Sequence, residues 1–387
     1  MTDPPTQGAR AGRNWPAEDD TYRDPTTGAR VHRLTGYPNA GDHHLYFTKR
    51  GWYDGGRRLL VRLNRTDTAG RQLFSIDLES GLLTQVTDLD GFGGTSLFPA
   101  ENVLYGWVGD AIVRFDLDTF TVEEVLYEVP DGYTKGTFDV GADQERLFVS
   151  MHTPVEVPGE DSHLVEMMEA KPPTRIVEVS LDTGDERVLL EEDGWLSTHM
   201  DASPTRPGLI MYPYQGPWGE FEDKVWVHDV DADERYSVRS TPGEGGIGHQ
   251  HWLAGGERVG YHGWDGTRGD PDCFYGHARY DGSETVETSI PVRQTHCHTN
   301  APDLFVCDGS TEVPWLLLYR WDADAEAYVG PRKLATHDWG ADSPHPHARL
   351  SPDGSQVLFD SDRYEGSSDV YLVDVPAFES LPRYDPA

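Results

Sequence analysis

The chain has 387 residues, with 67 acidic and 32 basic side chains, so its formal net charge is −35. That charge excludes nucleic acids and anionic membranes as partners, because both attract basic surfaces. No apolar run approaches the ~18 residues that a membrane span needs. Aromatic residues make up 11% of the chain, which favours a folded core over disorder.

The acidic residues are scattered along the whole chain, and only five of the basic residues are Lys. A folded surface of this composition suits molar salt, where repulsion between charges is screened over ~3 Å. We therefore expect the cytoplasm of a halophile, with an ordinary acidic mesophilic enzyme as the alternative. Residues 1–20 lack the basic and apolar segments of a secretory signal. Three cysteines without C-x-x-C spacing (Cys273, Cys297 and Cys307) favour reduced thiols over a disulfide framework or a thiolate zinc site.

In chain order, residues 1–35 are polar, rich in Pro and Gly and aperiodic, and they predict a mobile tail. A short pattern then recurs: an alternating strand, an Asp or similar residue, and a tight turn. The seven copies are residues 73–77, 112–116, 176–180, 225–229, 274–282, 317–322 and 370–374. Their average spacing of ~50 residues is typical of propeller blades.

A second element, a turn that leads into a strand, precedes several copies, most clearly at residues 351–360. Helical periodicity is almost absent; the exception is 161–170, inside an insertion at 153–173 that we expect to cap one face. These patterns predict an all-β fold: a seven-bladed β-propeller, formed as a single domain by residues 36–380. A duplicated two-sheet sandwich is the alternative, but the repeat is too short for it.

Three H-x-H pairs lie in the C-terminal part of the chain: His249/His251, His296/His298 and His345/His347. Residues i and i+2 of a strand point to the same face, so each pair can present two imidazoles together. Imidazole is the commonest protein metal ligand and the usual general base near neutral pH. The pairs therefore predict a metal site with a base beside it, and packing inside a blade is the alternative.

About one blade separates His296 from His345. Because inner strands of adjacent blades face each other across a propeller's channel, His296, His345 and His347 are predicted to converge on one ion. Pro346 keeps the second pair extended. Nitrogen ligands suit Zn²⁺, Mn²⁺, Fe²⁺, Ni²⁺ or Cu²⁺, and ligand type alone does not choose among them. Asp342 is a candidate oxygen ligand, with a solvated loop carboxylate as the alternative.

Several blocks of the sequence resemble the oligogalacturonate lyases, the family 22 polysaccharide lyases. The blocks are His43-His-Leu-Tyr-Phe-Thr48, Lys171-Pro-Pro-Thr-Arg-Ile176 through Asp182-Thr-Gly184, His199 with Ser203-Pro204, Gln215-Gly-Pro-Trp218, Gly248-His249, His296 with Asn300, and His345-Pro-His347 before Ser351-Pro-Asp-Gly354. The resemblance covers about residues 40–375 in the same order. It implies a seven-bladed propeller that holds Mn²⁺ with three His and a Gln and cleaves short pectic oligomers by β-elimination.

Carried over residue by residue, the resemblance makes His296, His345 and His347 metal ligands and His249 the base. The family's Gln ligand falls on Asp342, which adds a negative charge beside the metal. Lys224 stands where a substrate-binding Arg is expected, and Gln215 stands where Glu is expected.

We expect His199, Gln215 and His251 to contact the substrate, and His298 and His262 are further candidates. The departures from the family pattern allow the same chemistry on a different uronide.

β-Elimination of a uronide removes the proton at C5, which is very weakly acidic because the enolate product carries two negative charges. The reaction therefore needs a divalent cation on the carboxylate, an unligated imidazole as base, and a cation for the neighbouring sugar. We expect a metal-dependent oligogalacturonide lyase with Mn²⁺ as cofactor and an acidic oligosaccharide as partner, acting as a monomer or homodimer.

Three other interpretations remain. The first is a lyase for ulvan, glucuronan or rhamnogalacturonan fragments, and the second is a non-catalytic Tol-type propeller scaffold. The third is a hydrolase, which is disfavoured because the only Gly/Ser candidates for a nucleophile turn lie in predicted blade turns.

Overall fold

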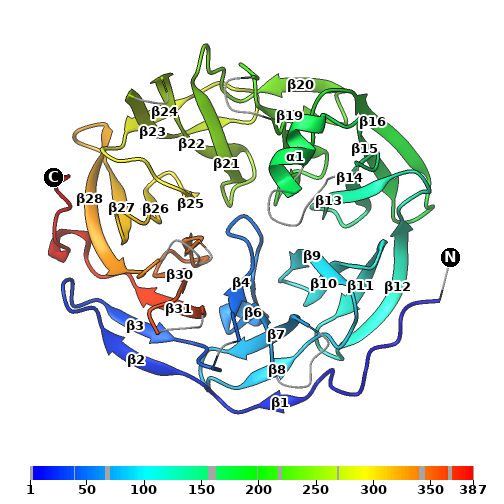
Figure 1. Cartoon of the computed structure of the whole chain (residues 1–387), viewed down its shortest axis with the longest axis horizontal. Coiled ribbons are helices and arrows are strands. Elements are labelled where there is room, and N and C mark those ends of the chain that lie inside the picture. Colours follow the sequence, from blue (N-terminus) through cyan, green and yellow to red (C-terminus); the bar gives the residue numbers. More distant parts are fainter. Residues whose placement is uncertain are drawn as a thin grey trace.

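The computed structural model describes residues 3–38, 40–65, 70–155, 163–197, 199–216, 220–267, 270–339, 345–364 and 368–386, and the structural statements below refer to these residues. The chain folds into seven antiparallel sheets, arranged as blades in a ring around a central axis (Figure 1). This arrangement confirms the predicted all-β, seven-bladed propeller.

The first four blades follow one another along the chain, each with its first strand innermost. Blade 1 contains β4 (His43–His44), β5 (Trp52–Tyr53), β6 (Arg58–Leu63), β7 (Gln72–Asp77) and β8 (Leu83–Gln85), with β1 (Asn14–Trp15) on its outer edge. Blade 2 contains β9 (Phe92–Phe98), β10 (Val103–Val108), β11 (Ala111–Asp116) and β12 (Thr121–Glu128). Blade 3 contains β13 (Thr134–Val140), β14 (Arg146–His152), β15 (Thr174–Ser180) and β16 (Glu186–Glu192). Blade 4 contains β17 (Asp201–Ala202), β18 (Leu209–Pro213), β19 (Val225–Asp229) and β20 (Glu234–Ser237).

The last three blades complete the ring. Blade 5 contains β21 (Gly246–Trp252), β22 (Arg258–Thr267), β23 (Asp270–Arg279) and β24 (Val286–Ser289). Blade 6 contains β25 (Cys297–Ala301), β26 (Leu304–Cys307), β27 (Trp315–Asp322) and β28 (Ala327–Thr336). Blade 7 combines β29 (Arg349–Leu350), β30 (Gln356–Ser361) and β31 (Asp369–Asp374) with β3 (Arg30–Arg33) and β2 (Asp20–Arg23). The helical segments are α1 (His163–Ala170) and the 3₁₀ turns Asp54–Gly56 and Phe378–Ser380.

The seven sequence copies are the third strands of the seven blades: β7, β11, β15, β19, β23, β27 and β31. The recurring Asp ends the third strand and accepts hydrogen bonds from the turn that follows. Asp77 Oδ1, for example, accepts the backbone N–H groups of Glu79 and Ser80 (3.1 and 3.0 Å). A short carboxylate that bonds its own downstream backbone stabilises a tight turn, which explains why Asp recurs at this point of the repeat.

Buried apolar side chains of the described residues form seven clusters, and each cluster lies between two adjacent blades. One cluster, for example, joins Val306 and Leu318 of blade 6 to Val357 and Tyr371 of blade 7. Each blade therefore buries both of its faces against its neighbours, so the closed ring is needed to complete the core.

Residues 14–33 contain three strands, which corrects the mobile tail expected for residues 1–35. β3 pairs with β31, where Val31 lies opposite Val373, so the two ends of the chain close blade 7 together. β1 pairs with β8, and the backbone N–H of Gly8 donates to the Asp88 carbonyl (3.0 Å). β1 and β2 are outer-edge strands with mostly exposed side chains, so the sequence carries no apolar alternation there.

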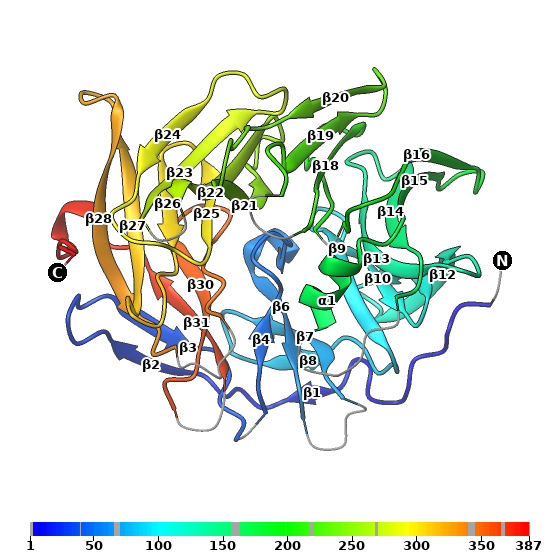
Figure 2. The same ribbon diagram turned by 45° about the horizontal axis from the view of Figure 1, so that its top comes forward.

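The loop between β4 and β5 enters the centre of the ring (Figures 1 and 2). At its tip, the fully buried ring of Phe47 is surrounded by imidazoles. The distances between ring centroids are 5.2–6.3 Å to His249, His251, His296, His298 and His347. Phe47 therefore divides the central axis into two ends.

Cys297 and Cys307 lie opposite each other on β25 and β26 and form a disulfide, whereas Cys273 is free. This corrects the reduced thiols expected at Cys297 and Cys307, because the pairing depends on strand register and not on a recognisable spacing. α1 begins at His163, within the predicted helical segment 161–170. No helix in the described residues combines the length and the hydropathy that crossing a membrane requires.

Candidate metal centre

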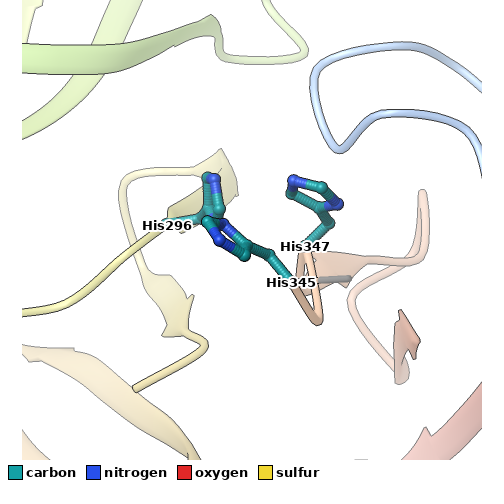
Figure 3. A group of neighbouring side chains, drawn as sticks. All are labelled: His296, His345 and His347. Atoms are coloured by element: carbon teal, nitrogen blue, oxygen red, sulfur yellow. The ribbon is translucent and has the colours of Figure 1, made fainter. Parts of the chain in front are cut away.

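Three histidines meet near the centre of the ring (Figure 3). His296 immediately precedes β25 of blade 6, and His345 and His347 precede β29 of blade 7. One ring nitrogen from each residue lies within 4.8 Å of the other two. The structure thus brings together the three residues whose one-blade spacing predicted convergence. We call them the histidine cluster.

A buried carboxylate that the sequence analysis missed, Asp308, orients this cluster. Asp308 Oδ2 accepts hydrogen bonds from His296 Nδ1 (2.7 Å) and from the backbone N–H of His347 (3.2 Å). Its Oδ1 accepts the backbone N–H of His296 (2.7 Å). Because Nδ1 of His296 donates to Asp308, its Nε2 lone pair is left for a metal, a common arrangement for ligating histidines. No sequence motif distinguishes Asp308 from the other acidic residues of the chain, which number 67 in total. The only signal is its position directly after β26, the strand that pairs with β25.

The turn that carries His347 is held by blade 1. His347 has a positive φ of 51°, which costs a non-glycine residue ~1–3 kcal/mol and therefore needs support from its surroundings. The carbonyl of Pro346 lies 3.2 Å from Nε2 of His44 and accepts the backbone N–H of Asp360 (2.9 Å). Asp360 in turn accepts the backbone N–H of His44 (3.0 Å). The His43-His44 block, which forms β4, therefore positions His347 of the histidine cluster.

His249 lies beside the cluster on β21 of blade 5. Its φ is 51°, and a β-bulge interrupts the pairing of β21 with β22 between Gly248 and His251. The bulge places the His249 ring 4.4 Å from the His296 ring, measured between centroids. A bulge breaks the two-residue alternation of a strand, so the common face expected for His249 and His251 is wrong.

The partners of His262 fix the protonation of His249. His249 Nδ1 lies 2.9 Å from His262 Nε2, and His262 also hydrogen-bonds the backbone of Thr295. We assign the Thr295 carbonyl as the acceptor for Nδ1–H of His262, because the Thr295 N–H already donates to the Gly309 carbonyl (3.0 Å) and Nε2 of His262 faces His249. Nε2 of His262 then accepts from Nδ1–H of His249. In the neutral state, His249 therefore keeps a lone pair on Nε2, the atom that a general base uses.

Burial keeps these imidazoles neutral. Burial, and next the nearby His296, holds the pKa of His249 well below its usual range. Burial likewise lowers the pKa of His296 and His345. A neutral imidazole is the form that binds a metal or accepts a proton, so the site is in its working state at neutral pH.

Two of the predicted substrate-binding residues lie next to His249. Lys224 is buried, and burial lowers its pKa to about 8, so its amine is still mostly charged at pH 7. Burial and then the charge of Lys224 lower the pKa of His199 to about 4, and Lys224 also lowers the pKa of His249. The centroid of the Tyr46 ring lies 5.4 Å from that of His199 and 5.0 Å from that of His347.

The remaining predicted residues are not gathered in the same way. His251 is buried, its Nε2 accepts the backbone N–H of Thr299 (3.1 Å), and its ring stacks on His298. Its contact with substrate stays a prediction, and its ring lines neither of the two cavities beside the histidine cluster. Gln215 forms a backbone bridge to Leu196, and the described structure gives its side chain no contact with the cluster. Asp342 lies outside the described residues.

Two cavities flank the histidine cluster. One, of about 500 Å³, is lined by His249, His262 and His345 together with Trp264, Trp339 and Arg293. The other, of about 430 Å³, is lined by Tyr46, His199 and His347. Both border the segments at which the inner strands begin, so they lie at the same end of the central axis, which we call the cluster end. The histidine cluster is therefore bordered by a cavity on each side.

The histidine cluster fits a divalent transition metal. It offers three neutral nitrogen donors and no thiolate, a set that suits Mn²⁺, Fe²⁺ or Zn²⁺. Three protein ligands leave coordination positions open for substrate or water, as at catalytic metal sites. His345 is exposed, so the open positions are reached from solvent.

Comparisons with known proteins agree on one family. A family model described as oligogalacturonate lyase matches residues 10–379. The oligogalacturonide lyase of Pectobacterium atrosepticum is 25% identical over 402 residues, covering 94% of this chain and 98% of its own. The oligogalacturonate lyase of Dickeya dadantii is 25% identical over 396 residues, covering 92% and 96%. A solved oligogalacturonate lyase in complex with manganese superimposes with a TM-score of 0.83 at 26% identity, covering 95% and 98%. The protein belongs to the oligogalacturonate lyase family, as the sequence resemblance indicated.

Proposed function

We propose that this protein cleaves short oligogalacturonides by β-elimination, with Mn²⁺ held by His296, His345 and His347. Membership of the lyase family supports the reaction, and the relative solved with manganese supports the cation. The observation that carries the proposal is the position of His249, an imidazole outside the cluster with its ring 4.4 Å from that of His296. Proton removal next to a carboxylate needs a base at this position.

The three histidines hold the cation, and Asp308 fixes the ring of His296 through the 2.7 Å hydrogen bond to Nδ1. When bound, the cation supplies Lewis-acid stabilisation of the negative charge that develops on the substrate's carboxylate. The protein's part is to keep His296 and His347 neutral by burial and to leave one side of the cluster open at His345, which is exposed to solvent but desolvated enough for its pKa to be lowered.

His249 takes the proton from C5 on its Nε2. Its own Nδ1–H points to His262, at 2.9 Å, so the positive charge that forms on His249 is shared with a hydrogen-bond acceptor. As C5 loses its proton, the bond between C4 and the glycosidic oxygen breaks, and an unsaturated uronate is left. The proton on His249 then returns to solvent, which resets the base.

Lys224 binds the carboxylate of a neighbouring sugar. It is one of only five lysines in the chain, and it is buried close enough to His199 and His249 for its charge to lower the pKa of both. A local cation is needed because the net charge of −35 repels an anionic oligomer. For the same reason the enzyme is expected to work in molar salt, in the cytoplasm of a halophile.

A lyase for a different uronide is the second candidate, and Lys224 is the observation that favours it. An ammonium is a point charge, whereas the guanidinium expected at this position recognises a carboxylate through two parallel hydrogen bonds. The substitution therefore relaxes the recognition of the neighbouring sugar and permits a uronide with another linkage.

Incubation with trigalacturonate in molar KCl tests the proposal. The ultraviolet absorbance of the unsaturated product should rise, a chelator should abolish the rise, and Mn²⁺ should restore it. The matched control is His345→Ala, an exposed position whose loss should empty the site and stop the reaction. Protein that retains Mn²⁺ but gives no product would favour another uronide. Protein that retains no metal after dialysis would favour the scaffold interpretation.

A further inference from the structure

A second cavity lies on the central axis at the end opposite the histidine cluster. It has a volume of about 320 Å³, and it is lined by residues at the far ends of the inner strands, including Phe98, Val140, Trp252 and Asn300. The buried ring of Phe47 lies between it and the cluster end, and Thr48, Lys49 and Asp201 line both this cavity and the one beside His347. The loop that carries Phe47 continues into this cavity, which its next residues, Lys49 and Arg50, also line.

Three cations line this cavity, and within the described part of the chain two of them, Arg50 and Arg349, form no ion pair with a carboxylate. Lys49 is paired, with its Nζ 2.5 Å from Asp201 and 3.7 Å from Asp139. Arg50 lies over the ring of Phe98 at 5.8 Å and has no hydrogen-bonded carboxylate among the described residues. Arg349 donates one N–H to the carbonyl of Phe47, and its Nε has no partner among the described residues.

The charges of the cavity do not balance. Lys49, Arg50 and Arg349 outnumber Asp139 and Asp201 by one positive charge, within a chain of net charge −35. Burial, and then repulsion from Arg50, lowers the pKa of Arg349 to about 9. Two guanidinium groups that repel each other in a partly enclosed space are stabilised by an anion between them.

We propose that this cavity binds a small carboxylate anion on the guanidinium groups of Arg50 and Arg349. The single excess positive charge favours a monoanion over a dianion such as phosphate. The planar fork of a guanidinium matches the two oxygens of a carboxylate, so a carboxylate is preferred over chloride.

The volume and the lining of the cavity limit the size of the anion that can bind. Trp52, Phe98 and Trp252 supply aromatic surface, and about 320 Å³ accommodates a ligand no larger than one sugar acid. Acetate and free galacturonate both satisfy this chemistry. The site is distinct from the histidine cluster, and the proposal holds whether or not the chain is a lyase.

The test measures thermal stability while KCl is replaced by potassium acetate or potassium galacturonate at constant ionic strength. Constant ionic strength removes general screening, so a saturable rise in Tm reports binding. A tenfold excess over Kd should raise Tm by about 2 °C in a chain of this length. The same titration is made with Arg50→Met, with Arg349→Met and with Arg30→Met, an exposed arginine on β3 that gives the same change in charge.

The expected result is a saturable rise in the unmodified protein and in Arg30→Met, with at least a tenfold weaker response in Arg50→Met and Arg349→Met. A larger rise with galacturonate than with acetate would identify a sugar acid as the occupant. His345→Ala separates the two ends of the axis, because binding at the histidine cluster would be lost there and binding in this cavity would persist. No saturable rise, an equal rise in the two cavity variants, or loss of the rise in His345→Ala would each overturn the proposal.

Discussion

Asp308→Asn tests how the histidine cluster is held together. The carboxylate accepts three hydrogen bonds: from His296 Nδ1 (2.7 Å), from the backbone of His296 (2.7 Å) and from the backbone of His347 (3.2 Å). An amide of the same shape has only one acceptor oxygen. If that oxygen takes the Oδ2 position, the amide NH₂ group faces the backbone N–H of His296. Two donors then meet, and the backbone N–H loses its acceptor. In the reverse orientation, two of the three hydrogen bonds are lost.

These contacts determine how much metal affinity and how much stability the substitution should cost. Removing the partner that orients a ligating histidine lowers metal affinity by ~10–100-fold, which is ~1.4–2.7 kcal/mol. Leaving one buried N–H unsatisfied adds a loss of ~1–3 kcal/mol in the free energy of unfolding. We therefore expect Asp308→Asn to fold, to be less stable, and to bind Mn²⁺ at least ~10-fold more weakly.

Competition between the protein and a fluorescent chelator measures the affinity, and urea unfolding measures the stability. Asp369→Asn is the matched control, because Asp369 is a fully buried carboxylate that accepts two hydrogen bonds from Arg33 on β3 (3.0 and 2.6 Å). It should lose stability and keep its metal affinity. If Asp308→Asn binds Mn²⁺ as tightly as the unmodified protein does, Asp308 does not orient the cluster.

Three further predictions concern the base, its partner and acid stability. His249→Ala should keep its Mn²⁺ and lower kcat by at least ~10²-fold, and near-full turnover would show that another group takes the proton. His262→Phe removes the acceptor for Nδ1–H of His249, so it should lower kcat by ~10-fold or more without changing metal affinity, whereas His262→Gln should restore part of the rate. Burial lowers the pKa of His277 to about 4, below its unfolded value of 6.5, so the unfolded state takes up the proton first as pH falls. Between pH 7 and pH 5 this should cost about 2 kcal/mol in the free energy of unfolding, and His277→Gln should remove that part of the pH dependence in urea titrations.

The propeller fold could be predicted because the signal for each repeat comes from residues that are close together in the sequence. Four third strands end in an Asp that accepts hydrogen bonds from the turn that follows, so the blade period is visible in the chain itself; these are Asp77, Asp116, Asp229 and Asp322. The N-terminal strands could not be predicted in this way. β3 pairs with β31, more than 300 residues away. β2 pairs with β3 at the outer edge of the blade, and its mostly exposed side chains carry no apolar alternation.

Part of the candidate site could also be predicted, because the spacing of its histidines along the chain matches the blade repeat. The convergence of His296, His345 and His347 follows from blade spacing alone. Asp308 and His262 act through contacts that depend on cross-strand register and on a bulge, and neither feature leaves a mark in the sequence. The bulge that places His249 at the cluster end leaves His251 packed on His298, an arrangement that the two-residue alternation of a strand does not indicate.

The masses of the products formed from trigalacturonate by the Mn²⁺-loaded protein test the central claim most directly. Elimination adds nothing to the substrate, so the masses of the two fragments should sum to that of trigalacturonate, and one fragment should carry the unsaturated uronate. Hydrolysis would give fragments whose masses sum to the substrate plus one water. We expect the first result, with product formed at least ~10²-fold more slowly by His249→Ala and none formed by chelated protein; fragments that sum to the substrate plus one water would refute β-elimination.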